Sequence, residues 1–484
     1  MDKISRVLTG LMLLLCGILL LSALLLGTLF QLEHKSYLAA LAIAIVLVSL
    51  WFVLSGKHRK RPGLWQKLGV VPSGALLALL CLGIQLAGAL PIHLQPEVDA
   101  GTYWSSALAL SRGEPVPNPL FLALFPHIVG YARFLGLVLR VFGRSLTVAV
   151  CCNAFVSTLS GLLLYVLLLR WRDPDTAAWG FLLWTLCPSK LLYCAGIYAD
   201  GYYTCLLLLF FLLVSLAEGA RPLKAALFGL LGGLVLLLVN TARPIAAVPI
   251  LALGIWALLL RRPDRDGVPA RGRWLLFLAA LLLVYLPLQR LWNTNLEQLL
   301  GEKPAGVPGY SIYVGFNSES GGSYSEEDMD RLLSLRDETG SADAAQRQIL
   351  QEALPRVRSV DPLRLFPRKI ATFLGNDEGG AFYASAALSA LAYRVAAVAS
   401  NVFFYAIVLL ALRGLLCLWK DGCQSALLLL PLSLVGITLA QMLVEVAGRY
   451  HYSLIPILVL LAALSLGERC KGRDPNPAGP GRER

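Results

Sequence analysis

The chain is built as a series of long apolar runs separated by short polar connections. About twelve runs are long enough to cross a membrane as helices: residues 7–31, 37–55, 67–92, 146–169, 175–196, 201–218, 223–241, 244–260, 274–291, 393–412, 424–444 and 452–467. A helix rises about 1.5 Å per residue, so a run of roughly 20 apolar residues matches the hydrocarbon thickness of a bilayer. The pattern predicts an all-α polytopic membrane protein.

Composition and charge support this prediction. Of the 484 residues, 57% are apolar and 15% are charged, against roughly 45–50% and about 25% in soluble proteins. The formal net charge of +12 would also suit a nucleic-acid binder. The basic residues, however, gather in short connections between runs, as they do where positive charge keeps a loop in the cytoplasm. A soluble fold is therefore excluded, and no nucleic-acid partner is expected.

The stretch 120–142 decides the topology. It is apolar, but it also contains Pro126, His127, Arg133 and Arg140. We interpret it as an amphipathic helix in the outer membrane interface. The alternative, a true span, would turn the basic connection at residues 261–273 to the outside, against the usual distribution of positive charge.

Two connections are unusually long, and both are expected on the extracytoplasmic side. The predicted units are an N-terminal hairpin at 1–66, a core at 67–291 with a first outer loop at 93–145, an insert at 292–392, C-terminal helices at 393–467 and a cytoplasmic tail at 468–484. Aromatic and apolar residues in the insert predict a folded unit, with an amphipathic helix in 326–354 and a loop at 306–324.

The insert also holds a basic cluster. Its members are Arg356, Arg358, Arg364, Arg368 and Lys369. The cluster can bind phosphate, but we favour anionic lipid headgroups or simple solvation.

Candidate chemistry gathers where the runs end on the outer side. Glu97 and Asp99 follow the third run, and carboxylates there can serve as a general base or merely cap a helix in a solvated loop. Further polar residues stand in short outer turns: Asp200, Arg243, Glu445, Arg449, Tyr450 and His451. Each alone can be an interface anchor. Together, acids and arginines suit a reaction that releases a phosphate, which a guanidinium binds through two hydrogen bonds.

In their order and membrane side, these motifs resemble the GT-C glycosyltransferases, in particular the protein O-mannosyltransferases and the lipid A aminoarabinose transferase. The matching stretches are Glu97-Val-Asp99-Ala-Gly-Thr-Tyr103, Ala107-Leu-Ala-Leu-Ser-Arg-Gly113, Phe125-Pro-His127 with Phe142-Gly143, Pro188 through Tyr198-Ala-Asp200, Arg243-Pro244, Tyr313 through Asp328, and Glu445-Val-Ala-Gly-Arg449-Tyr450. The family often has adjacent acids, whereas Val98 separates them here. The family also commonly has one run before the acidic loop, whereas this chain has two.

The resemblance implies a GT-C-like bundle that performs an inverting sugar transfer on the extracytoplasmic face. The donor would be a polyprenyl-phosphate-linked sugar, and the acceptor a glycan, a lipid or a protein. The implied roles are a base (Asp99, or else Glu97), donor-phosphate binding (Arg243, Arg449, Tyr450 and His451), and orientation of the acceptor or of a divalent cation such as Mg or Mn (Asp200, Tyr103 and Glu445). Metal ligands are not identified.

The motifs that carry the resemblance further imply that the protein lies in the bacterial cytoplasmic membrane, with its active site facing outward. The sugar and the acceptor are not indicated, because related sites carry different specificities. The alternative function is a secondary transporter or lipid flippase of cell-envelope precursors, because twelve spans suit that class as well. The chain shows no convincing repeat between its halves, and no nucleotide-binding or zinc-protease motif.

Overall fold

The computed structural model describes residues 2–30, 35–55, 64–260, 270–423 and 425–467. All regular structure in these ranges is helical, which confirms the predicted all-α polytopic class. Within the described ranges, nine helices are long and apolar enough to span a membrane. They are α1 (Asp2–Leu29), α2 (Lys35–Ser55), α4 (Val70–Ala89), α8 (Leu146–Trp171), α11 (Asp200–Ala217), α12 (Pro222–Ala242), α14 (Ala270–Leu300), α20 (Ala390–Lys420) and η4 (Gly448–Leu454) continued by α22 (Ile455–Leu466).

The three other predicted runs are helical but shorter or interrupted. The run 175–196 forms α9 (Pro174–Thr185) and α10 (Pro188–Ala195), because a proline cannot donate its backbone nitrogen and so begins a new helix. The other two runs form α13 (Ala247–Ile255) with the π-helical η1 (Trp256–Leu260), and η3 (Ala426–Leu428) with α21 (Leu429–Met442). Every predicted run therefore has a helical counterpart.

The stretch 120–142 forms α6 (Pro119–Leu124) and α7 (His127–Phe142), with a break at Phe125 and Pro126. The longer of the two, α7, has 16 residues and extends about 24 Å, less than the roughly 30 Å of a hydrocarbon core. One face of α7 is buried against α5 (Val98–Arg112) and α12. Its length and its single buried face agree with an interface helix better than with a span.

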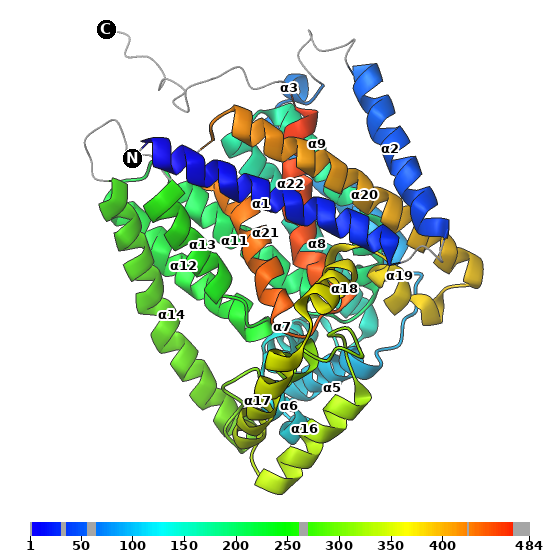
Figure 1. Ribbon diagram of the computed structural model, residues 1–484, viewed down its shortest axis with the longest axis vertical. Helices are drawn as coiled ribbons and strands as arrows, with labels where there is room; N and C mark the ends of the chain where they lie inside the picture. Colours follow the sequence, from blue (N-terminus) through cyan, green and yellow to red (C-terminus); the bar gives the residue numbers. More distant parts are fainter. Residues whose placement is uncertain (1, 31–34, 56–63, 261–269, 424, 468–484) are drawn as a thin grey trace.

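The two long connections lie together at one end of the molecule (Figure 1). The short helix α3 (Leu64–Leu68) and the N-terminal ends of α1 and α14 lie at the opposite end. Helix α6, from the first connection, packs against α17 (Ala342–Ser359), from the insert, and α17 in turn packs against α16 (Glu326–Thr339). The arrangement agrees with the prediction that both connections share one side of the membrane.

The insert is folded, as predicted, and its helices α16 and α17 occupy the stretch expected to be amphipathic. The expected loop at 306–324 is partly wrong, because it contains α15 (Gly309–Gly315). A Cβ on Gly309 would lie 1.9 Å from the carbonyl oxygen of Gln346. The glycine therefore permits close packing of α15 on α17 and does not mark a turn.

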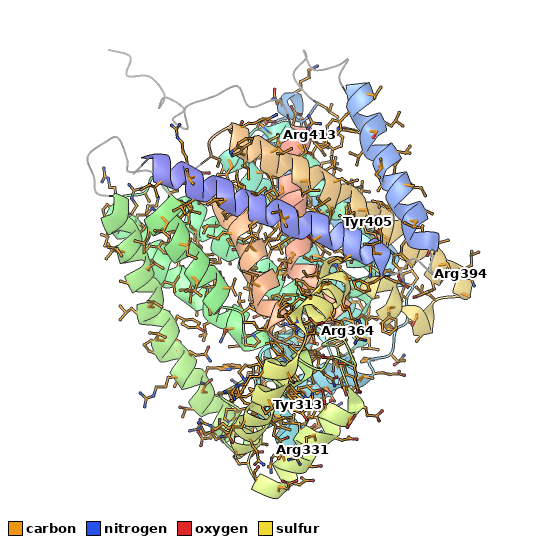
Figure 2. All side chains as sticks on the ribbon, viewed as in Figure 1. Tyr313, Arg331, Arg364, Arg394, Tyr405 and Arg413 are labelled. Carbon is orange, nitrogen blue, oxygen red and sulfur yellow. The ribbon has the colours of Figure 1, made fainter. Side chains whose placement is uncertain are left out.

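The basic cluster of the insert is divided by the fold. Arg356 donates to both carboxylate oxygens of the buried Asp328 and covers the Tyr313 ring, whereas Lys369 on α18 (Pro362–Leu374) is fully buried. Arg364 is exposed near the start of α18, where Figure 2 labels it. Two of the five basic residues are thus structural, and headgroup binding remains a prediction for the exposed ones.

The N-terminal hairpin packs against the rest of the bundle. Helix α1 crosses α18, α20 and α21 obliquely, and α2 lies along α20 (Figure 1). A Cβ on Gly27 would lie 2.2 Å from the carbonyl oxygen of Gly375, and a Cβ on Gly375 would lie 2.6 Å from the Cα of Gly27, so the crossing of α1 needs glycine at both positions. The two extra runs therefore contact the segment that follows α18, close to the outer side.

Candidate functional site

An ion pair between Arg449 and Asp99 lies at the centre of the outer polar residues. Asp99 stands in the first turn of α5, and Arg449 stands in η4, 350 positions later. The guanidinium Nη2 donates to the Asp99 carboxylate. The arginine side chain is 10% exposed and that of the aspartate is 50% exposed. The carboxylate is therefore accessible from outside the protein, while the cation is held inside it.

Three tyrosines surround the Arg449 guanidinium. Its Cζ lies 5.5 Å from the Tyr198 ring centroid, 5.2 Å from that of Tyr383 and 5.5 Å from that of Tyr450. Ring faces attract a cation without neutralising it. The buried Nε of Arg449 has no hydrogen-bond partner among the residues that the structure describes. The group therefore keeps donor capacity beyond its bond to Asp99.

A second cation, Arg243, shares one of these rings. Arg243 directly follows α12, and its Cζ lies 3.9 Å from the Tyr450 centroid. Within the described ranges no hydrogen bond or ion pair to its guanidinium is formed, and the side chain is partly exposed. Tyr450 thus lies between two arginines, of which one has no anionic partner. A charge in such surroundings is stabilised by a bound anion.

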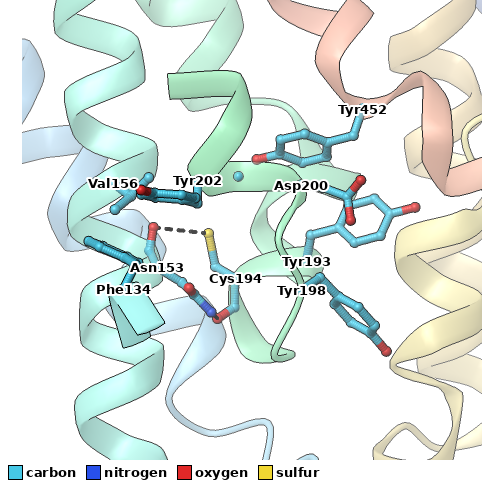
Figure 3. A pocket seen from close by; sticks show the side chains of 10 residues that line it. Phe134, Asn153, Val156, Tyr193, Cys194, Tyr198, Asp200, Tyr202 and Tyr452 are labelled. Atoms are coloured by element: carbon cyan, nitrogen blue, oxygen red, sulfur yellow. Dashed lines mark hydrogen bonds between the residues drawn. The ribbon is translucent and has the colours of Figure 1, made fainter. Parts of the chain in front are cut away.

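Asp200 begins α11 and is 5% exposed. It accepts a hydrogen bond of 3.3 Å from the Tyr203 hydroxyl. Its carboxylate lies beside Tyr193 and Tyr452 at a cavity of about 20 Å³ (Figure 3). That volume holds about one water molecule, so Asp200 faces a small polar space and not open solvent.

Glu445 lies at the boundary between the bundle and the insert. Its backbone nitrogen donates to the Ser311 carbonyl at 2.7 Å, and the next residue, Val446, donates to the Gly322 carbonyl at 2.8 Å. Burial raises the pKa of Glu445, while the charges of Arg243 and Arg449 act in the opposite direction. The insert thus forms one wall of the site.

Tyr103 lies one helical turn after Asp99. The side chain is 6% exposed, and its ring packs edge-to-face on Tyr131 at 5.3 Å. Burial raises the pKa of the Tyr103 hydroxyl, so that it stays protonated. The charges of Arg449, Arg243 and Asp200 all act on it, which places Tyr103 behind the ion pair.

Two candidate residues are placed apart from this group. Glu97 is exposed at the N-terminal end of α5, and no hydrogen bond or ion pair of its side chain is found in the described ranges. Val98 between the acids has φ +49°, a conformation that β-branched residues rarely adopt. His451 is 1% exposed and bonded to Asp377 at 3.1 Å, so it faces the core instead of the arginines.

The structure adds residues that the sequence reasoning did not assign to the site. His127 begins α7, and burial, followed by the charge of Arg243, lowers its pKa to about 3. The histidine is therefore a neutral neighbour of the cations. Its motif was recognised but was attributed to the interface helix. Tyr198 stands in the quoted stretch Tyr198-Ala-Asp200 but had no role assigned, and Tyr383 stands in no quoted motif. Only the fold brings the two rings to Arg449.

The predicted divalent cation has no evident set of ligands. Among the described residues, no group of three or more His, Cys, Asp and Glu side chains is arranged to hold a metal ion. Asp200 offers a single carboxylate. A role for Mg or Mn therefore stays a prediction.

Comparison with known proteins gives two similar solved structures. No protein-family model and no curated protein sequence matches the chain. The chain is similar to ArnT from Cupriavidus metallidurans bound to undecaprenyl phosphate, with 13% identity, 81% of this chain and 77% of that chain covered, and a TM-score of 0.35. For ArnT in the apo state the values are 14%, 81%, 76% and 0.34. ArnT is a lipid A aminoarabinose transferase, one of the enzymes that the sequence resembles. At these TM-scores the likeness carries no functional argument, which rests on the site itself.

Proposed function

We propose that this multi-pass membrane protein is a GT-C-type glycosyltransferase that uses a polyprenyl-phosphate-linked sugar. The observation that carries the proposal is the unpaired guanidinium of Arg243. It lies on the same tyrosine ring as Arg449, which pairs with the half-exposed Asp99. A phosphate at the head of a lipid supplies the missing anion while its tail remains in the bilayer.

The proposed reaction is a single displacement with inversion. Asp99 removes the proton from the acceptor hydroxyl, whose oxygen attacks the anomeric carbon of the donor. The bond between that carbon and the phosphate oxygen breaks, and the polyprenyl phosphate leaves with the bonding electrons. Arg243 and Arg449 stabilise the charge that develops on the phosphate. The free Nε of Arg449 allows this arginine to bind phosphate without leaving Asp99.

The remaining polar residues are assigned to orientation. Asp200 and Tyr103 lie on the protein side of the ion pair, and we assign them to the acceptor or to a cation. Glu445 and the insert lie on the outer side. Because the insert holds the backbone of Glu445 and Val446, we assign acceptor choice to the insert.

We also propose that the site faces outward from a bacterial cytoplasmic membrane. The basic connections of the sequence favour this orientation. The location of the insert at the end opposite to the start of α1 also agrees with it (Figure 1). A lipid-linked donor suits that side, because nucleotide sugars are absent there.

The test is transfer of radiolabelled sugar from polyprenyl-phosphate donors by the purified protein in lipid. We expect Asp99→Asn to lower the rate by about 10³-fold, the range of general-base catalysis. The exposed neighbour provides a matched control, because Glu97→Gln removes the same charge two residues away and should stay within about threefold.

Two results would contradict the proposal. If Asp99→Asn and Glu97→Gln lower the transfer rate equally, Asp99 is not distinguished as the base. Absence of turnover with every donor, together with donor binding that depends on Arg243, would favour the transporter or flippase.

A further inference from the structure

The loop between α18 and α19 (Gly379–Tyr383), together with the first two residues of α19, connects three parts of the bundle. This segment, residues 375–380, is called the Asp377 loop. The Asp377 carboxylate is 1% exposed and accepts hydrogen bonds from the Ser189 hydroxyl of α10 and from His451 Nε2, the latter at 3.1 Å. The Asp377 backbone nitrogen donates to the Asn401 side chain of α20 at 2.8 Å. A buried carboxylate with this many partners fixes its neighbours firmly.

The His451 ring is held firmly in the core. The ring is 1% exposed and packs against Phe373 and Phe404. In the described part of the chain Nδ1 has no hydrogen-bond partner. The hydrogen bond between Nε2 and Asp377 is therefore the polar contact that fixes the orientation of the ring.

This pair is directly connected to Arg449. His451 and Arg449 belong to the same 3-10 helix, η4, two residues apart. The Asp377 loop also packs close to the backbone at Arg449. A Cβ on Gly379 would lie 3.5 Å from the Arg449 nitrogen and 2.3 Å from the Tyr193 hydroxyl oxygen. Movement of the loop would therefore shift the backbone that carries the site arginine.

Glu378, the residue after Asp377, connects the Asp377 loop to the N-terminal hairpin. The Glu378 carboxylate accepts hydrogen bonds from the hydroxyls of Tyr37 and Tyr393. Tyr37 belongs to α2 and is 9% exposed, and Tyr393 belongs to α20. The hairpin that has no evident place in the site is therefore linked to Arg449 through one loop.

We propose that Tyr37, Glu378, Asp377 and His451 form a positioning relay that aims Arg449 at Asp99 and at the donor phosphate. The proposal rests on the proposed function for its catalytic consequence. It assigns a role to the two extra N-terminal runs. They hold the Asp377 loop in place, although they contribute no group that touches the substrate.

The first test measures the relay without catalysis. Hydrogen–deuterium exchange is followed in peptides covering residues 445–454 of the full chain in lipid nanodiscs. We expect Tyr37→Phe and Glu378→Gln to increase exchange there severalfold. The control is Tyr165→Phe, which removes a buried tyrosine hydrogen bond of 2.9 Å to the Val70 carbonyl in another part of the bundle. Unchanged exchange in both relay variants would overturn the proposal.

The second test separates positioning from folding. Tyr37→Phe should lower kcat about tenfold and change the donor KM by less than twofold. A small misalignment of a charged group costs transition-state stabilisation more than binding. Tyr165→Phe should leave both constants unchanged. A wild-type kcat in Tyr37→Phe would overturn the relay even if exchange increased.

The two proposals fail in different ways. Should the wild-type protein turn over no donor, the proposed function fails, and the exchange measurement alone decides on the relay. Asp377→Asn is the more severe variant and can fail to fold. Tyr37→Phe at the edge of the bundle keeps the test valid, because it removes one hydroxyl and leaves the carboxylates in place.

Discussion

The cations of the insert and the cations of the candidate site are treated differently by the same fold. Lys369 is fully buried and donates to the carbonyl oxygens of Gly315, Met442 and Val444 at 2.7–2.8 Å. In the site, Arg243 lies on the Tyr450 ring, and no anion pairs with it in the described ranges. Lys369 therefore has all its hydrogen bonds made, whereas Arg243 lacks an anionic partner in the described ranges.

The contrast distinguishes structural charges from functional ones. A buried cation whose hydrogen bonds are all made stabilises the fold, and its removal leaves acceptors unsatisfied. A cation left unpaired lowers stability and persists where a ligand completes it. The comparison therefore predicts that changes to Lys369 alter stability, whereas changes to Arg243 alter activity.

The largest expected effect is on activity, at Arg243. Arg243→Ala should lower sugar transfer by about 10²–10³-fold, the usual loss when one group that stabilises transition-state charge is removed. Unfolding should change by less than about 1 kcal/mol, because no ion pair is lost. The measurements are initial rates and the denaturation midpoint in detergent.

Arg243→Lys provides the matched variant. It keeps the charge but loses the planar group that stacks on Tyr450 and binds phosphate through two bonds, so an intermediate rate is expected. A large loss of stability in Arg243→Ala with a normal rate in the folded fraction would break the comparison, because Arg243 would then be structural.

The helical elements of this architecture could be predicted from the chain, because long apolar runs and basic connections act locally. The same reasoning placed Asp99, Arg243 and Arg449 at one membrane face, because each follows or precedes a run. It could not pair Arg449 with Asp99, since that contact depends on how distant helices pack. The resemblance makes Asp99 the first choice of base and leaves Glu97 as the alternative; the sequence could not predict the positive φ of Val98, which lies between them.

The orientation of His451 could not be predicted for a similar reason. His451 follows Tyr450 directly, and both were assigned to the donor phosphate. In a 3-10 helix each residue rotates by about 120°, so neighbours face different directions. The partner that attracts His451 is Asp377 in the insert, one of many acids there. Only the three-dimensional contact distinguishes it.

The second prediction concerns Lys369, the cation whose hydrogen bonds are all made. Lys369→Met should lower the free energy of unfolding by about 3 kcal/mol, because three buried carbonyl groups lose their donor. The neighbouring Arg368 makes a single bond of 3.3 Å to the Ser318 carbonyl. Arg368→Met should therefore cost less than about 0.5 kcal/mol. If the two substitutions lower the free energy of unfolding equally in denaturant titrations, the burial of Lys369 contributes no additional stability.

The smallest effect concerns Glu445, and it decides whether Arg243 is truly unpaired. Burial raises the pKa of this carboxyl above its ordinary value of 4.5, against the charges of Arg243 and Arg449. A group with a raised pKa in the folded state stabilises below its unfolded pKa, and the contribution is lost as pH rises through the folded value. The stability of the wild type relative to Glu445→Gln should therefore fall as pH rises from about 4 upward. Denaturant titrations of both proteins across this range measure the difference.

The donor lipid should shift this pH dependence. Polyprenyl phosphate should move the loss of stability to higher pH, because a nearby anion disfavours the Glu445 carboxylate. If the wild type instead gains stability relative to the variant with rising pH, Glu445 neutralises the arginines, and the contrast between the two kinds of cation disappears.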